Sequence, residues 1–230
     1  MGRLPKIILA LIIIFALVFA IIFFVNKNKQ KQSSSPPSSS TAPPPQTETK
    51  KDLSNINPQD YTEVLNKNFQ ISQTKALEWK KNASFVFLRV QIPDDLNPLK
   101  VTETYVYDSP DSPLMYWTIG LNLKGDFLRA LIYKNDFLQG ENTKKIATQF
   151  WQIDWLTAFQ KAEKNGGQEF REKNKNGLEI NADLKCGEPK GYLYWFISYR
   201  ALDSDENKVI QVDANSGEVI QPETTPSPQT

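Results

Sequence analysis

An internal repeat constrains the fold of this 230-residue chain more than any other feature of its sequence. Residues 69–77 and 151–159 share one pattern: an aromatic residue, Gln, Ile, a short polar residue and, four positions later, Ala followed by an apolar residue. The short polar residues, Ser72 and Asp154, are natural N-caps because their side-chain oxygens can accept the unpaired amide protons of a first helical turn. The repeat therefore predicts a helix opening at each segment, within two related structural units.

Alternation of apolar residues predicts antiparallel strands after each of these helices. In the first unit the expected strands are residues 85–92, 101–107, 115–123 and 127–133. In the second unit they are residues 169–171, 178–184, 192–200 and 208–214. Tyr116 and Trp117 of the first unit align with Tyr194 and Trp195 of the second. The sequence thus predicts an α+β fold of two tandem units, each with a helix packed on an antiparallel sheet.

Changes in composition mark the boundaries of these units. Residues 32–51 are rich in Pro, Ser and Thr, and they contain too little apolar surface to offset the entropy of an ordered chain. Asn57 followed by Pro58 predicts a short helix at the start of the folded region. The expected segments are a signal anchor at 1–31, a disordered linker at 32–51, the two units at 52–140 and 141–222, and a disordered tail at 223–230.

Residues 7–25 form an uninterrupted apolar run. At about 1.5 Å per residue, a helix of this length crosses a hydrocarbon core of roughly 30 Å. A cleaved signal peptide would have a shorter apolar core and a small-residue cleavage site, so we expect an uncleaved transmembrane helix. Basic residues flank the run on both sides, and the Pro/Ser-rich segment that follows is typical of extracellular stalks. We therefore expect a single-pass protein of the cell membrane whose C-terminal region is extracytoplasmic.

The composition removes several classes of chemistry. The chain has no His, which is the commonest general base near neutral pH and the commonest metal ligand. Its one cysteine, Cys186, has no second thiol for a disulfide or a zinc site. A formal net charge of +1 gives no bias toward nucleic acid. We expect no enzymatic activity, no catalytic or metal-binding residue, no cofactor and no nucleic-acid partner. An enzyme that uses carboxylates is the least favoured alternative, and a conspicuous pocket with two facing acids would support it.

Aromatic residues are dense in two of the expected strands and allow two interpretations. Trp117 and Trp195 are expected in the core between helix and sheet. Tyr116, Tyr192 and Tyr194 lie off that face, where they could either pack or line an exposed groove for a peptide or glycan. These three tyrosines are candidate binding residues.

The second unit resembles the PepSY domain family. The residues that carry the resemblance are the helix at 158–162 running to Gly166 and Gly167, the strand with Tyr194, Trp195 and Tyr199, and the ending at 212–219. That ending matches the family pattern hydrophobic-Asp-Ala-x-x-Gly-Glu-hydrophobic. The resemblance covers residues 151–221. Residues 69–140 are a degenerate copy, whose ending at 132–140 lacks the Asp-Ala step.

This resemblance implies an extracytoplasmic binding or regulatory module, and in some members of the family the domain restrains thermolysin-like metallopeptidases. Asp213 and Gly217 are expected to serve first as turn residues, since a carboxylate accepts nearby amide protons and glycine tolerates a positive φ. A ligand role for Asp213 is the second interpretation, which makes it a fourth candidate binding residue.

We therefore expect a non-enzymatic, membrane-tethered module, typical of bacterial surface proteins, that binds a protein or peptide partner and can restrain a cell-surface peptidase. It would present a sheet edge or an aromatic groove to an extended chain, whose main-chain hydrogen bonds supply affinity. The alternative is a structural scaffold subunit of an envelope complex. An exposed, unpaired edge strand beside apolar side chains would favour peptide capture over the scaffold.

Overall fold

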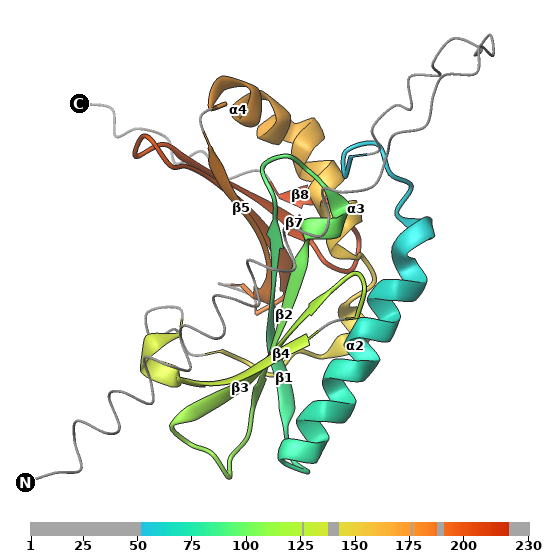
Figure 1. Ribbon diagram of the computed structural model, residues 1–230, viewed down its shortest axis with the longest axis vertical. Helices are drawn as coiled ribbons and strands as arrows, with labels where there is room; N and C mark the ends of the chain where they lie inside the picture. Colours follow the sequence, from blue (N-terminus) through green and yellow to red (C-terminus); the bar gives the residue numbers. More distant parts are fainter. Residues whose placement is uncertain (1–51, 126, 138–142, 176, 188–190, 221–230) are drawn as a thin grey trace, which may run out of the picture. The chain divides into compact units, whose positions relative to one another are not determined.

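Within the described residues, eight strands form one antiparallel sheet (Figure 1). The structure is a computed structural model and describes residues 52–125, 127–137, 143–175, 177–187 and 191–220. The strands are β1 (Ser84–Ile92), β2 (Thr102–Asp108), β3 (Met115–Asn122), β4 (Phe127–Tyr133), β5 (Leu178–Cys186), β6 (Leu193–Ala201), β7 (Asn207–Asp213) and β8 (Val219–Ile220). Their order across the sheet is β4-β3-β2-β1-β5-β6-β7-β8.

Helical segments precede and connect these strands. They are α2 (Gln59–Trp79), η2 (Pro98–Lys100), η3 (Lys134–Asp136), η5 (Thr148–Phe150), α3 (Trp155–Ala162), η6 (Glu163–Gly167) and α4 (Gln168–Lys173). The predicted α+β class is confirmed. No helix in the part of the chain that the structure describes has the length and apolar character needed to span a membrane. The predicted span at 7–25, the linker at 32–51 and the tail at 223–230 lie outside the described residues.

The strand order is symmetric about the central pair of β1 and β5. These two strands run antiparallel, with Val90 opposite Ala182. On each side of this pair, every further strand is paired with the strand that precedes it in sequence. Each half of the sheet therefore consists of four consecutive strands that follow a helical region, and the first strands of the two halves meet in the middle.

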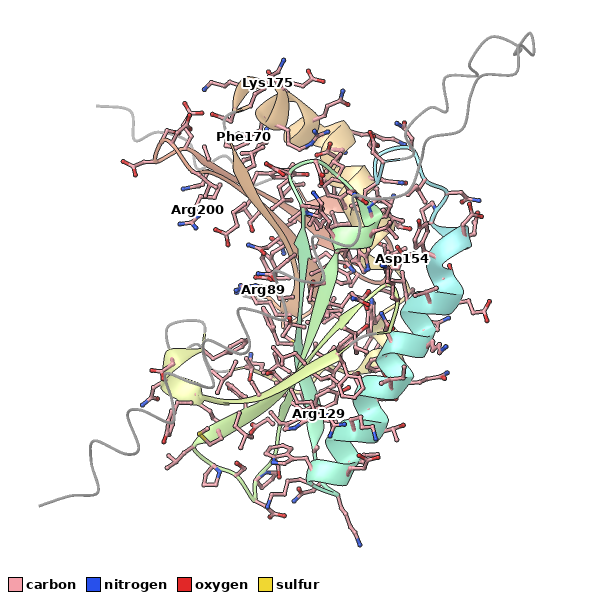
Figure 2. The ribbon with its side chains drawn as sticks, in the orientation of Figure 1. Arg89, Arg129, Asp154, Phe170, Lys175 and Arg200 are labelled. Carbon is pink, nitrogen blue, oxygen red and sulfur yellow. The ribbon has the colours of Figure 1, made fainter. Side chains whose placement is uncertain are left out.

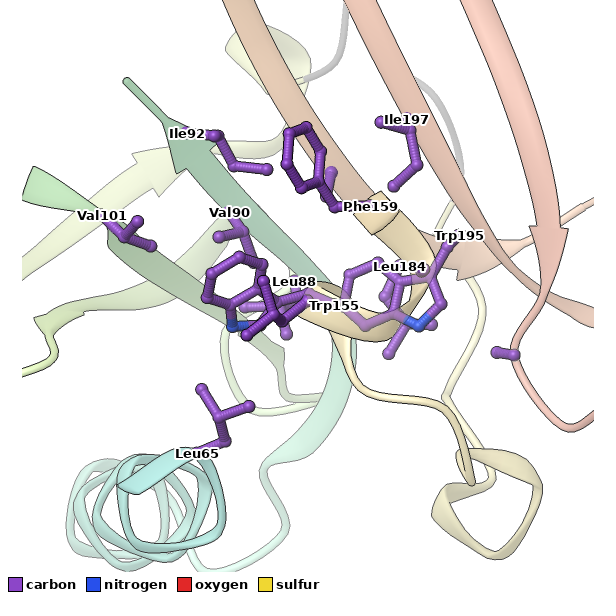
Figure 3. Packing of buried hydrophobic residues seen from close by; sticks show 14 of the residues in the cluster. Leu65, Leu88, Val90, Ile92, Val101, Trp155, Phe159, Leu184, Trp195 and Ile197 are labelled. Atoms are coloured by element: carbon purple, nitrogen blue, oxygen red, sulfur yellow. The ribbon is translucent and has the colours of Figure 1, made fainter. Parts of the chain in front are cut away.

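One hydrophobic core lies between the sheet and the helices and receives side chains from both halves. Figure 3 shows Leu65 of α2 directed toward Trp155 of α3, which lies beside Leu88 and Val90 of β1. The rings of Phe69 and Trp151, the first residues of the two repeat segments, contact each other with their centroids 5.2 Å apart. The two repeat segments therefore meet in a shared core.

The first repeat segment does not open a helix. The short helix expected after Pro58 and the helix expected at Ser72 are one continuous element, α2, which begins at Gln59. Ser72 is buried in the middle of α2, so the prediction that it is an N-cap is wrong. Its hydroxyl bonds instead to the carbonyl of Phe69 and to the Tyr107 hydroxyl, each at 2.7 Å. The serine serves a tertiary contact with β2 that local sequence does not reveal.

The helix of the second repeat segment begins as predicted, but the structure that follows this segment differs from the prediction. Asp154 caps α3, with its carboxylate accepting the Thr157 amide proton at 2.7 Å. The helix breaks at Gly166, where φ is 99°, and the chain then resumes a helical conformation. Residues 169–171, expected as a strand, therefore lie in α4. This short helix places Arg171 against the buried carboxylate of Glu163.

The final hairpin of each half closes with similar turn chemistry. Asp213 accepts two turn amide protons at 2.8 and 2.7 Å, and Gly217 has a φ of 73°. In the turn between β3 and β4, Asn122 accepts one turn amide proton at 2.9 Å, and Gly125 has a φ of 83°. By position in the sheet, the first-half turn that corresponds to the turn at Asp213 begins at Asn122, whereas the ending expected at 132–140 begins within β4 and extends beyond the described residues.

The alignment of Tyr116 and Trp117 with Tyr194 and Trp195 is also wrong. The first pair lies on β3, the third strand of its half, whereas the second pair lies on β6, the second strand of its half. By position in the sheet, the counterpart of β6 is β2. Similar aromatic pairs recur because both strands pack against the same core. The two pairs do not occupy equivalent positions in the two halves.

Candidate functional site

β4 forms one edge of the sheet and exposes a row of apolar side chains. It pairs with β3 on one side, and no strand among the described residues pairs with its other side. The exposed fractions are 49% for Phe127, 77% for Leu128, 54% for Leu131 and 60% for Tyr133. Natural sheets keep their edges short or charged to avoid unwanted pairing, as the two-residue β8 does at the opposite edge. A seven-residue edge strand with Arg129 as its one charge is therefore suited to pairing with another chain.

The main chain of β4 presents regularly spaced hydrogen-bonding groups along this edge. The Ala130 carbonyl accepts a hydrogen bond from the Thr118 hydroxyl at 3.2 Å, and the Lys134 amide donates to the Leu114 carbonyl at 3.0 Å. Main-chain groups at even-numbered positions therefore point toward β3. Because the direction alternates along an antiparallel strand, the amide and carbonyl groups at odd-numbered positions, including Leu131, point away from the sheet.

The side chains of β4 extend both faces of the sheet beyond β3. Leu131 lies opposite Trp117 and Phe127 lies opposite Leu121, so both continue the face that packs against the helices. Leu128 and the other even-numbered residues continue the opposite face. An added strand would therefore find apolar neighbours on both faces.

Two of the candidate residues from the sequence share a hollow elsewhere on the molecule. Tyr192 and Asp213 line a hollow of about 430 Å³ together with Lys145, Phe150 and Leu193. Tyr192 is 56% exposed. Asp213 has the turn role described above, so the expected turn chemistry is confirmed.

The other two candidates do not face this hollow. Tyr116 is buried in a small cluster on the other face of the sheet, where its ring contacts Phe137 and its hydroxyl bonds to the Thr143 hydroxyl at 2.8 Å. Tyr194 is also largely buried and packs edge-to-face on Phe196. The four candidates therefore do not form one groove. Trp117 and Trp195, which were expected in the core, are buried there.

A second cavity, of about 370 Å³, opens between α2 and the start of α3 and has Glu103 of β2 in its lining. Glu103 is 1% exposed. Its Oε1 accepts a hydrogen bond from the Trp155 indole at 2.7 Å, and its Oε2 accepts from the Tyr105 hydroxyl and the Asn68 amide, each at 2.9 Å. No cation of the described residues pairs with Glu103. It is thus a buried carboxylate held by neutral donors alone.

The pKa of Glu103 makes stability depend on pH. Burial raises this pKa from its usual 4.5 to about 6, although the three hydrogen bonds lower it in part. The folded protein then holds the proton more tightly than the unfolded chain. Raising the pH from about 4 to about 7 should therefore remove about 2 kcal/mol of stability through this residue. Glu103→Gln cannot ionise, so in urea denaturation the variant should gain this amount relative to the parent over the same pH range. Identical pH dependence in both proteins would contradict the assignment.

Glu103 was not predicted from the sequence as a site residue. A usable signal was present, since Glu103, Tyr105 and Tyr107 of β2 continue an alternation that starts at Val101, and three of these four residues are apolar or aromatic. An acid in that series must point toward the core. A charged residue at an inward position of a strand indicates a satisfied buried group or a site.

Two acids, Glu103 and Asp154, line this cavity, which is the feature expected of a carboxylate enzyme. Both oxygens of Asp154, however, accept hydrogen bonds from Thr157, through its amide and its hydroxyl. The Asp154 carboxylate therefore caps α3. Among the described residues, no group of three or more His, Cys, Asp and Glu side chains is arranged to hold a metal ion.

Comparisons of the chain with protein-family models, with curated proteins and with solved structures found no match.

Proposed function

We propose that this protein is a non-enzymatic binding module that captures an extended segment of a protein partner as an additional strand at β4. The observation that supports this proposal best is the free, apolar edge of β4 in the described structure. An added strand would bond to the outward main-chain groups of β4, which supply affinity largely independent of sequence. Exposed side chains such as Leu128 and Leu131 would select apolar residues at alternate positions of the partner.

The architecture around β4 suits such a role. Because β4 is anchored through β3 to a sheet whose one face is packed by α2 and α3, the edge is held in an extended conformation before any partner arrives. A preorganised edge lowers the conformational entropy lost on binding. The partner we infer is an extended apolar segment with no basic residue facing Arg129.

The proposal includes the membrane anchor, the extracytoplasmic location and the duplicated PepSY-like units inferred from the sequence. The apolar run at 7–25 supports the anchor, and the symmetric strand order with similar final turns supports the duplication. A peptidase at the cell surface fits as a partner. If an extended segment of the peptidase pairs with β4 as an added strand, that segment is blocked or held in one orientation, and the peptidase is restrained. Pairing of β4 with β4 of a second copy is the scaffold alternative, and the same experiment detects it.

The main-chain contribution can be tested by substitution at an outward-facing position. Leu131→Pro removes an outward amide proton without removing a hydrogen bond to β3, whereas Leu131→Ala keeps that proton and shortens the same side chain. Peptides are selected from a displayed random library against the full chain. Their affinity for Leu131→Ala should be a few fold lower than for the parent. Their affinity for Leu131→Pro should be lower by at least about tenfold, a change of about 1.4 kcal/mol in binding free energy. Binding should be measured by calorimetry.

Equal affinity of the selected peptides for the proline and alanine variants would contradict capture by strand addition. A second outcome would support the scaffold function in place of peptide capture. In that case no peptide is selected, the parent dimerises in a concentration-dependent way, and Leu131→Pro abolishes the dimer.

A further inference from the structure

Each half of the molecule contains a buried glutamate bonded to a tyrosine of its second strand. In the first half the Tyr105 hydroxyl of β2 donates to Glu103 at 2.9 Å. In the second half the Tyr199 hydroxyl of β6 donates to Glu163, also at 2.9 Å. The two carboxylates differ in whether they have a charged partner. Glu163 has a cationic partner, Arg171, and Glu103 has none among the described residues.

The absence of this cation coincides with a cavity. In the second half, α4 supplies Arg171 to the carboxylate of Glu163. In the first half, the carboxylate of Glu103 lines the opening of about 370 Å³ instead. None of the described residues that line the opening is basic. Asp154 in the same lining adds a second negative charge. Asp154 lies on the α2 side of the sheet, whereas Arg89 and Arg200 lie on the opposite side (Figure 2). The described lining therefore contains two acidic side chains and no basic one, a composition that favours a cation.

The walls of the cavity suit an organic cation. Phe69, Trp151, Trp155 and Tyr105 contribute aromatic surface, and ring faces attract ammonium and guanidinium groups. Thr62, Asn66 and Gln152 at the rim are exposed, so the cavity opens to solvent. Oε1 of Glu103 accepts a single hydrogen bond, from Trp155, and a carboxylate oxygen has two lone pairs. One lone pair of Oε1 thus receives no hydrogen bond from the described residues.

We propose that this cavity is a binding site for one guanidinium or primary ammonium group, which pairs with Glu103 between the aromatic walls as Arg171 pairs with Glu163. The cation comes either from an Arg or Lys side chain of a peptide or from a free small amine. The site is on the helix-covered face of the sheet and does not depend on strand addition at β4.

The test uses the purified full chain and the NMR signal of the Trp155 indole proton, which reports directly on the Glu103 oxygen. Four probes are titrated: N-acetyl-arginine amide, N-acetyl-lysine amide, agmatine and, as the neutral isostere of arginine, N-acetyl-citrulline amide. The arginine probe should bind at least about tenfold more tightly than the citrulline probe. Its affinity should rise between about pH 5 and about pH 7, as Glu103 loses its proton.

Matched variants separate the carboxylate from general charge. Glu103→Gln should lose at least about tenfold in affinity for the arginine probe and lose the pH dependence. Glu179→Gln removes an exposed carboxylate that pairs with Arg200, and it should bind like the parent. Tighter binding of agmatine than of the blocked amino acids assigns the site to free amines, and the reverse order assigns it to peptide side chains.

Equal binding of the citrulline and arginine probes, or undiminished binding by folded Glu103→Gln, would overturn the proposal. If Glu103→Gln does not fold, the comparison of the two probes and the pH profile of the parent decide the question. Because none of these measurements involves β4, their failure would leave the proposed strand capture intact.

Discussion

Arg171→Met is expected to lower the free energy of unfolding by about 3–5 kcal/mol, since it leaves a buried charge without its partner. The Glu163 side chain is 5% exposed and accepts a hydrogen bond from Arg171 Nε at 2.8 Å. Methionine retains most of the packing of the arginine stem, so the loss comes mainly from the unpaired carboxylate. Urea denaturation near pH 7 measures the effect.

Arg200→Met is the matched control for this substitution. Arg200 also pairs with a glutamate, Glu179, but both side chains are exposed, and the expected loss is below about 1 kcal/mol. Adding Glu163→Leu to Arg171→Met should restore much of the lost stability, because it removes the unpaired charge. Similar losses for Arg171→Met and Arg200→Met would show that Glu163 is not buried as described.

Trp155→Ala is expected to cost about 3–5 kcal/mol, because it removes a fully buried indole from the centre of the core and enlarges the neighbouring cavity. The same change removes the one hydrogen bond that Oε1 of Glu103 accepts from the described residues. Thermal and urea denaturation of the variant measure the combined effect.

Trp155→Phe separates packing from hydrogen bonding. It retains an aromatic ring but removes the indole proton, and the expected loss is about 1–3 kcal/mol near neutral pH, as for a hydrogen bond to a charged group. This loss should shrink near pH 4, where Glu103 is protonated, because the missing donor then no longer faces a charge. A loss that is independent of pH would show that the indole does not stabilise the ionised carboxylate.

The strands were predictable because their signal is local. Alternation of apolar residues gave β1 to β4 and β5 to β7 within one or two residues of their observed bounds. The start of α2 after Pro58 was predicted, but the continuation of this helix through Ser72 was not predictable from the same information. Ser72 has the pattern of an N-cap, yet its hydroxyl bonds to Tyr107, which is distant in sequence. Tertiary contact overrides local capping preference there.

The functional features also divide into those that local sequence indicates and those that depend on contacts between distant segments. A sheet edge was expected to receive a partner, but which strand forms that edge depends on the pairing of β1 with β5, which brings the two halves together and leaves β4 outermost. The pairing of distant segments has no local signature. Glu103 was missed for a related reason: its role appears only when Trp155 and Asn68, from two different helices, converge on it.

Hydrogen exchange at the outward-facing amides of β4 tests directly whether this strand receives an extended chain. In the free full-length protein the amides of Arg129 and Leu131 should exchange rapidly, since no strand in the described part of the chain pairs with this side of β4. Saturation with a selected peptide should slow both by at least about tenfold while leaving the amides that face β3 unchanged. Protection elsewhere on the molecule, with Arg129 and Leu131 exchanging as in the free protein, would contradict the account.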